Sequence, residues 1–138
     1  MTGPSIPELR KVAVLDDDAG LTASIARMLR RFHLRAVTFT DPVALAAHDS
    51  EEAFDAFVLD WLLVNTTPLE LIEGIRGRAR NADVPIFLLT GNLAVGGIPS
   101  DPELLAAIDH HHLRYFAKPY SPIKLAQDLQ HSLTGGST

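Results

Sequence analysis

Three consecutive carboxylates, Asp16, Asp17 and Asp18, directly follow an apolar run in the stretch "VAVLDDDAGL" at residues 12–21. Like charges this close repel one another, and no basic residue follows for several positions, so the cluster needs a cation, a proton or exposure to solvent. An acidic triplet alone is more often a solvated turn or a helix cap, and Asp18 fits that simpler role. The residues that join Asp16 and Asp17 therefore decide what the cluster does.

Three further polar side chains occupy comparable positions. Asp60 follows a short apolar run in "AFVLDW", Thr90 closes "PIFLLT" and Lys118 follows the apolar run at the start of "YFAKPY". Carboxylates from two neighbouring strands suit a hard divalent cation such as Mg²⁺, which also takes waters and phosphate oxygens. A hydroxyl and an ammonium group can then bind further phosphoryl oxygens, and one carboxylate can act as the nucleophile that forms an acyl phosphate.

A scaffold must bring these positions together. Five short runs rich in Val, Ile, Leu and Phe are predicted as strands buried on both faces, at residues 11–15, 34–39, 55–59, 85–90 and 113–117. Helical spacing of apolar residues fills the stretches between them, and strict alternation predicts right-handed crossovers and a parallel sheet. Sites in such sheets lie beyond the carboxyl ends of the strands, so the acidic triplet, Asp60, Thr90 and Lys118 are expected at one edge.

Four helix starts are marked by local chemistry. Asp41-Pro42, Asp101-Pro102 and Ser121-Pro122 each place a capping side chain before a proline, which suits the first position of a helix. Thr67-Pro68-Leu69-Glu70 predicts a capping box, in which Glu70 bonds back to the cap residue.

Composition limits the classes of function. The 138 residues carry 12 basic and 17 acidic side chains, a net charge of −5, which argues against contact with nucleic acid. There is no cysteine, and the first residues lack the apolar stretch of a signal peptide. No segment approaches the roughly 20 apolar residues that cross a bilayer, so a cytoplasmic protein without membrane contact is the expectation.

The chain resembles a response-regulator receiver domain of two-component signalling from about Lys11 to Leu133. Six strand-end or switch positions carry the resemblance together with the Lys118-Pro119 pair, and they are Asp16 and Asp17 (acidic pair), Asp60 (phosphoacceptor), Thr90 (switch hydroxyl), Tyr115 (switch aromatic) and Lys118. The resemblance implies a flavodoxin-like α/β fold, a five-stranded parallel sheet of order 2-1-3-4-5 with five helices. Residues 1–10 are then a flexible segment, residues 11–133 the receiver domain, and residues 134–138 a tail or the start of a linker.

The same resemblance implies a function. A sensor histidine kinase or a histidine phosphotransfer protein donates a phosphoryl group to Asp60, and Mg²⁺ is held by Asp16, Asp17, Asp60 and the backbone carbonyl of Leu62. Lys118 and Thr90 bind phosphoryl oxygens, Thr90 and Tyr115 switch the output surface, and the Lys118–Pro119 bond is cis. The domain is then a signalling module that catalyses only its own phosphorylation and dephosphorylation, and its output partner or fused output domain is unknown.

The chain also departs from the family pattern. Val64 and Pro68 stand where a proline and a glycine usually follow the phosphoacceptor. The segment between Thr90 and Lys118 is longer than usual, and its glycines Gly91, Gly96 and Gly97 predict a mobile loop. The sequence "HHHLR" replaces acidic residues before Tyr115, which gives no support for the dimer contacts of many transcriptional receivers.

Other interpretations are weaker. A haloacid-dehalogenase-like phosphatase would use Asp16 as nucleophile and Asp18 as general acid, but it leaves Asp60 unexplained and lacks a later acidic pair. In a flavodoxin, the acidic triplet would repel the flavin phosphate. The tract His110 to His112 is not expected to hold a metal, because consecutive side chains on a helix point in different directions.

Overall fold

A parallel five-stranded sheet forms the centre of the computed structural model, which describes residues 9–63, 67–91, 101–118 and 121–134. The strands are β1 (Arg10–Leu15), β2 (Leu34–Phe39), β3 (Ala56–Asp60), β4 (Ile86–Thr90) and β5 (Arg114–Ala117). Their order is β2-β1-β3-β4-β5, and every neighbouring pair is parallel. The strands predicted from apolar runs are therefore confirmed to within one residue at each end.

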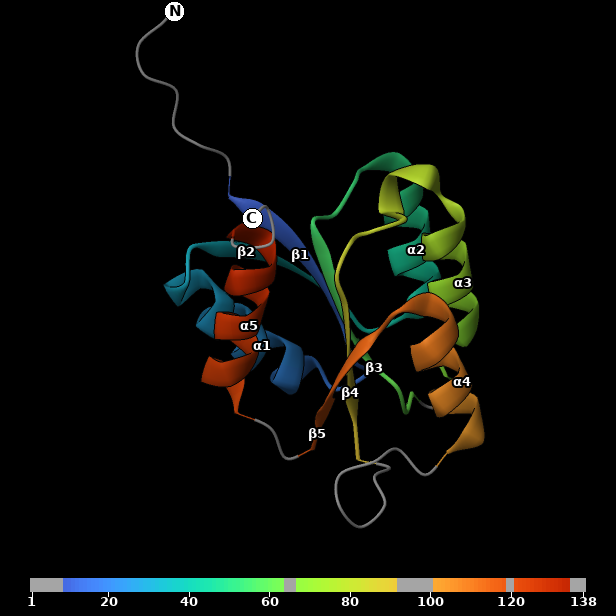
Figure 1. The fold of residues 1–138 in the computed structure, drawn as a ribbon. Coiled ribbons are helices and arrows are strands. Elements are labelled where there is room, and N and C mark those ends of the chain that lie inside the picture. The colour runs from blue at the N-terminus through green and yellow to red at the C-terminus, as the bar shows by residue number, and fades with distance from the viewer. Residues whose placement is uncertain (1–8, 64–66, 92–100, 119–120, 135–138) are drawn as a thin grey trace, which may run out of the picture.

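Helices cover both faces of this sheet (Figure 1). α1 (Ala19–Arg31) and α5 (Pro122–Thr134) lie on one face, and α2 (Pro42–Glu51), α3 (Leu69–Gly77) and α4 (Pro102–His111) lie on the other. A short 3₁₀ helix, η1 (Ala79–Asn81), follows α3. A helix lies between every two consecutive strands, so the flavodoxin-like doubly wound fold is confirmed.

The core consists of two apolar layers, one on each face of the sheet. Along β1, Val12 and Val14 pack in the layer shared with α1 and α5, whereas Ala13 and Leu15 pack in the layer on the opposite face. This period of two is the geometry of a strand, and both sets of side chains are buried because helices cover both faces.

The prediction that all five strands are buried on both faces is wrong for β2 and β5. These two strands form the edges of the sheet, and each is only partly buried. In β5 the side chains of Arg114 and Ala117 are exposed, and Tyr115 is 37% exposed. An apolar run predicts a strand, but its place in the sheet order decides how much of it is covered.

Local chemistry positions three of the four predicted helix starts. Asp41 Oδ1 accepts a hydrogen bond from the Val43 amide at 3.1 Å at the start of α2. In the same way, Asp101 Oδ1 accepts from the amide of Glu103 at 2.9 Å in α4. The hydroxyl of Ser121 accepts from the amide of Lys124 at 3.2 Å in α5.

The capping box predicted for Thr67 to Glu70 is wrong. α3 begins at Leu69, its N-cap residue is Pro68, and no side chain of the described residues caps it. Because the helix starts one residue later than predicted, Thr67 precedes the cap position. Glu70 nevertheless lies in the first turn, where a carboxylate suits the helix dipole.

Several sequence predictions fall on segments outside the described residues. They concern most of residues 1–10, the tail 135–138, Val64, the glycine-rich loop beyond Gly91, and the Lys118–Pro119 bond. β1 starts at Arg10 and α5 reaches Thr134, one residue beyond each predicted bound of the domain, and the division of the chain stays a prediction. Within the described residues, no helix combines the length and the apolar character that crossing a membrane requires.

Candidate phosphoacceptor site

The polar residues that follow the strands gather at one edge of the sheet, as predicted. The amide of Asp16, just after β1, donates to the Phe39 carbonyl at 3.2 Å, which prolongs the pairing of β1 with β2. Just after β5, the amide of Lys118 donates to the Thr90 carbonyl at 2.8 Å. Sheet pairing therefore fixes the backbone from which these side chains project.

Three carboxylates form a cluster at this edge. One oxygen from each of Asp16, Asp17 and Asp60 lies within 4.8 Å of the other two. Asp16 and Asp60 are each only 2% exposed, whereas Asp17 is exposed. Two buried carboxylates next to an exposed one form a site that a cation can reach from solvent.

Lys118 neutralises part of this negative charge. Its ammonium nitrogen donates to Asp60 Oδ1 at 2.8 Å and lies 3.9 Å from Asp16 Oδ2. The amide of Leu62 also donates to Asp60 Oδ1, at 3.4 Å. Asp60 is therefore the carboxylate to which both donors converge.

Asp16 carries the clearest signature of a cation site. Burial raises the pKa of Asp16, and the negative charges of Asp60 and Asp17 raise it further. Two groups lower this pKa: the amide of Asp18, which donates to Asp16 Oδ1 at 2.9 Å, and the ammonium group of Lys118. Asp16 Oδ2 is buried and accepts no hydrogen bond from any described residue. A buried carboxylate oxygen without a hydrogen bond needs another partner. Carboxylate oxygens are hard ligands, and a group of three carboxylates fits Mg²⁺.

Similarity to known proteins agrees with this geometry. The chain is 27% identical over 135 residues to a chemotaxis protein CheY homolog of Campylobacter jejuni, covering 92% of this chain and 95% of that protein. It is 22% identical to the phosphate regulon transcriptional regulatory protein PhoB of Klebsiella pneumoniae, covering 84% of this chain but only 48% of that protein. No protein-family model matches the chain.

Solved structures show the same fold. The chemotaxis response regulator CheY4 of Vibrio cholerae superposes with a TM-score of 0.76 at 21% identity, covering 91% of this chain and 99% of that one. A CheY-like receiver domain protein of Methanospirillum hungatei superposes with a TM-score of 0.78 at 18% identity, covering 94% and 97%. The chain therefore has the fold of these CheY-like proteins.

Neither the geometry nor the comparisons support the phosphatase alternative. Asp18, which would be the general acid, is instead the N-cap of α1, where its Oδ1 accepts from the Leu21 amide at 3.1 Å. The comparisons match receiver domains, and Asp60, which the phosphatase reading leaves unexplained, lies in the acidic cluster. The simpler role suggested for Asp18 is confirmed.

The remaining predicted site residues occupy the expected elements. Thr90 ends β4 and is fully buried, and Tyr115 pairs with Leu88 across β4 and β5. Leu62 follows Asp60 by two residues, and its side chain is 49% exposed. The structure therefore brings together Asp16, Asp17, Asp60 and Lys118, while the roles of Thr90, Tyr115 and the Leu62 carbonyl stay predictions.

The histidine tract lies away from this cluster, at the end of α4. His110 and His111 stack edge to face with ring centroids 4.6 Å apart, and His112 adopts the left-handed conformation that ends the helix. Among the described residues, the acidic cluster is the group of three or more side chains with the spacing of metal ligands. The expectation that this tract holds no metal stays a prediction.

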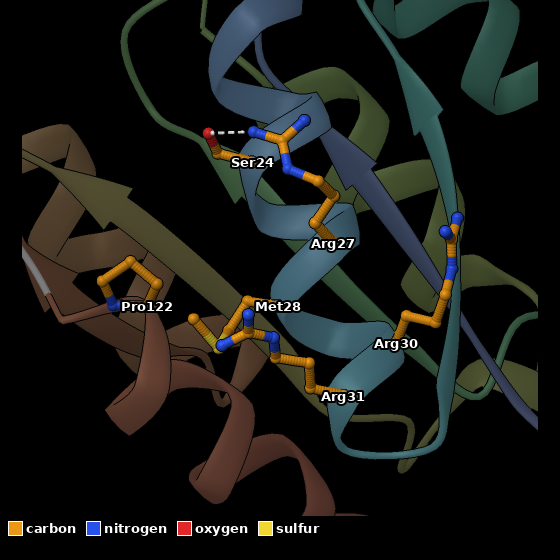
Figure 2. Close-up of a pocket in the computed structure, with 6 residues that line it drawn as sticks. All are labelled: Ser24, Arg27, Met28, Arg30, Arg31 and Pro122. Atoms are coloured by element: carbon orange, nitrogen blue, oxygen red, sulfur yellow. Dashed lines mark hydrogen bonds between the residues drawn. The ribbon is translucent and has the colours of Figure 1, made fainter.

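A groove of about 640 Å³ lies elsewhere on the molecule, along α1 and the start of α5 (Figure 2). Its lining consists of Ser24, Arg27, Met28, Arg30, Arg31 and Pro122. None of the clustered carboxylates lines it, so this basic groove is separate from the acidic cluster.

One neighbour of the site has no counterpart in the sequence predictions. The fully buried Trp61, next to Asp60, donates its indole N–H to Asp101 Oδ2 at 3.2 Å. The sequence predicts Asp101 as a helix cap, but its second contact joins residues that are 40 positions apart. No local sequence pattern predicts such a pair.

Proposed function

We propose that this receiver domain accepts a phosphoryl group on Asp60 from a phosphohistidine of a sensor kinase or phosphotransfer protein. One observation carries the proposal: the clustered carboxylates and Lys118 meet at Asp60, which accepts hydrogen bonds from both Lys118 and the Leu62 amide. A purely structural role would not require two buried carboxylates beside an exposed third one.

The proposed reaction is an in-line displacement. An oxygen of Asp60 forms a bond to phosphorus while the bond from phosphorus to the donor's imidazole nitrogen breaks, and the electron pair of that bond stays on the imidazole. Because Lys118 and Leu62 both donate to Oδ1, the other oxygen of Asp60 is the one that we assign as nucleophile. Hydrolysis of the resulting acyl phosphate by water returns the domain to its starting state.

The remaining residues have supporting roles. Asp16, Asp17, Asp60 and the Leu62 carbonyl would hold Mg²⁺, which supplies positive charge to the phosphoryl oxygens when it is bound. Lys118 and the Thr90 hydroxyl bind the other oxygens. Movement of Thr90 toward Asp60 then lets Tyr115 turn inward, a shift between two populated states rather than a new fold.

The wider proposal follows from the relatives. A chemotaxis protein and a transcriptional regulatory protein are signalling molecules, so we assign the domain to two-component signal transduction in the cytoplasm, with an output partner or output domain still to be identified. The excess of acidic residues favours an output that does not run through nucleic-acid contact by this domain.

Phosphorylation by a small donor tests the proposal. Acetyl phosphate with Mg²⁺ should add one phosphoryl group, visible as a mobility shift in phosphate-affinity electrophoresis, and a chelator or Asp60→Asn should abolish it. Asp128→Asn, which changes a carboxylate on α5 that pairs with Lys124, should leave the shift intact. Sustained hydrolysis of an aryl phosphate that Asp16→Asn removes would instead support a phosphatase.

A further inference from the structure

A partly buried hydrogen bond joins the residue after Asp60 to the start of α4. Trp61 is fully buried, and its indole N–H donates to Asp101 Oδ2 at 3.2 Å. A buried indole N–H without an acceptor is costly, so the Asp101 carboxylate is part of what holds the ring in place.

Asp101 serves two groups at once. Its Oδ1 accepts from the Glu103 amide at 2.9 Å and caps α4, while its Oδ2 accepts from Trp61. One carboxylate therefore ties the carboxyl end of β3 to the first turn of α4. A cap alone needs a single acceptor oxygen, which leaves the second contact to be explained.

The segment that this contact holds is the one next to the phosphoacceptor. The Trp61 amide donates to the Leu89 carbonyl at 2.9 Å, so the residue is fixed both through its backbone and through its ring. Leu62 has weaker anchors: its side chain is 49% exposed, and its amide reaches Asp60 Oδ1 at 3.4 Å, long for such a bond. Leu62 lies between two buried residues, Trp61 and Leu63, so the orientation of its backbone follows in part from how Trp61 is held.

We propose that Asp101 is a positioning residue for the phosphoacceptor site and that it acts through Trp61 on the Leu62 peptide. This inference rests on the function proposed above, in which the contact orients the Leu62 amide toward Asp60 and the Leu62 carbonyl toward Mg²⁺. Loss of the contact loosens this peptide and weakens metal binding, although Asp101 touches neither the metal nor the phosphoryl group. Partners that orient metal ligands have effects of this kind in other proteins.

The chain offers a matched control for the test. Asp41 begins α2 in the same Asp-Pro arrangement, and its Oδ1 accepts from the Val43 amide at 3.1 Å. Asp101→Asn and Asp41→Asn therefore make the same change at two helix caps, and each keeps an oxygen that can cap. Only the change at Asp101 also removes the acceptor of the Trp61 indole.

Calorimetric Mg²⁺ titration of the folded full chain is the primary measurement. Asp101→Asn and Trp61→Phe should each weaken Mg²⁺ binding by about tenfold, and the double variant should be no weaker than either single variant, because both remove one contact. Asp41→Asn should stay within about twofold of the unchanged chain. Asp101→Ser, which retains a good cap, should repeat the result if Asp101→Asn fails to fold.

The outcomes separate this inference from the proposed function. Equal Mg²⁺ affinity in the Asp101→Asn, Asp41→Asn and unchanged chains would overturn the positioning role alone, as would additive losses in the double variant. Mg²⁺ binding that weakens as described, in a chain that acetyl phosphate never labels, would support the positioning role and refute the proposed phosphorylation. A chain that binds no Mg²⁺ would overturn both.

Discussion

At the scale of single residues, the site is an arrangement of negative charge that one ammonium group only partly offsets. Lys118 bonds to Asp60 and lies near Asp16, but Asp16 Oδ2 has no hydrogen bond from a described residue, and its pKa is raised chiefly by burial. A divalent cation would add positive charge to this arrangement, and a phosphoryl group would add negative charge. The ammonium group of Lys118 should therefore favour binding of the phosphoryl group and oppose binding of the cation.

Replacement of Lys118 tests these two opposite effects. Lys118→Gln should slow phosphorylation by acetyl phosphate about 100-fold, because a charge that stabilises the phosphoryl oxygens is lost. It should tighten Mg²⁺ binding, because a competing cation has left the carboxylates. Rates of labelling and calorimetric titration measure the two effects, and Lys124→Gln, which changes a lysine paired with Asp128 on α5, should alter neither. Weaker Mg²⁺ binding in Lys118→Gln would contradict this account of the electrostatics.

At the scale of the elements, a second polar cluster holds α2 against the segment that follows α3. Asp49 on α2 is 2% exposed, and its Oδ2 lies 3.3 Å from Arg78 Nε and 3.1 Å from the side-chain nitrogen of the buried Asn81. Arg80 also contacts this carboxylate. The side chains of the two arginines are about 40% exposed, so water can replace Asp49 as their partner. The buried amide of Asn81 depends more strongly on Asp49 for a hydrogen-bond acceptor.

Asp49→Ala should therefore lower the free energy of unfolding by about 1–3 kcal/mol, because it leaves the buried Asn81 amide without its acceptor. Urea denaturation measures the loss, and Mg²⁺ affinity should not change. Asp128→Ala, which breaks an exposed pair on one helix, should cost no more than about 0.5 kcal/mol. Equal losses in the two variants would show that the Asp49 cluster adds nothing beyond a surface ion pair.

The end of α4 should make stability depend on pH. Burial is the largest cause that lowers the pKa of His111 below its ordinary value of 6.5, and the charge of His110 is the next. Arg76 and His112 also lower this pKa, whereas Glu73 raises it. The unfolded chain therefore binds a proton at a pH where the folded chain does not, so this contribution to stability is present above pH 6.5 and falls as the pH drops below it.

His111→Gln tests this sign. In urea denaturation at a series of pH values, the variant should lose less stability than the unchanged chain as the pH falls from 6.5, because it has no imidazole to protonate. His131→Gln, which changes an exposed histidine on α5, is the matched control. A steeper fall in His111→Gln would show that protonated His111 stabilises the fold.

At the scale of the whole molecule, the features that the sequence predicts are those with a local cause. The apolar runs predict all five strands, and Asp-Pro or Ser-Pro pairs mark three helix starts. The cluster of Asp16, Asp17 and Asp60 also follows from sequence, because parallel strands of known order bring their carboxyl ends together.

What the sequence does not predict depends on distant contacts. The partial exposure of β5 reflects its place at the edge of the sheet, which the run "LRYFA" itself does not encode. The failed capping box at Thr67 reflects a shift of one residue in the start of α3, which places Pro68 at the N-cap. The bond between Trp61 and Asp101 requires the folded sheet to bring β3 and α4 together.

The central claim is that Asp60, and no other carboxylate of the cluster, accepts the phosphoryl group. Peptide mapping by mass spectrometry after labelling with acetyl phosphate and Mg²⁺ tests it most directly. The account predicts the label on the peptide that contains Asp60, and its disappearance, without transfer to another site, in Asp60→Asn. A label on Asp16 or Asp17 in the unchanged chain would contradict it.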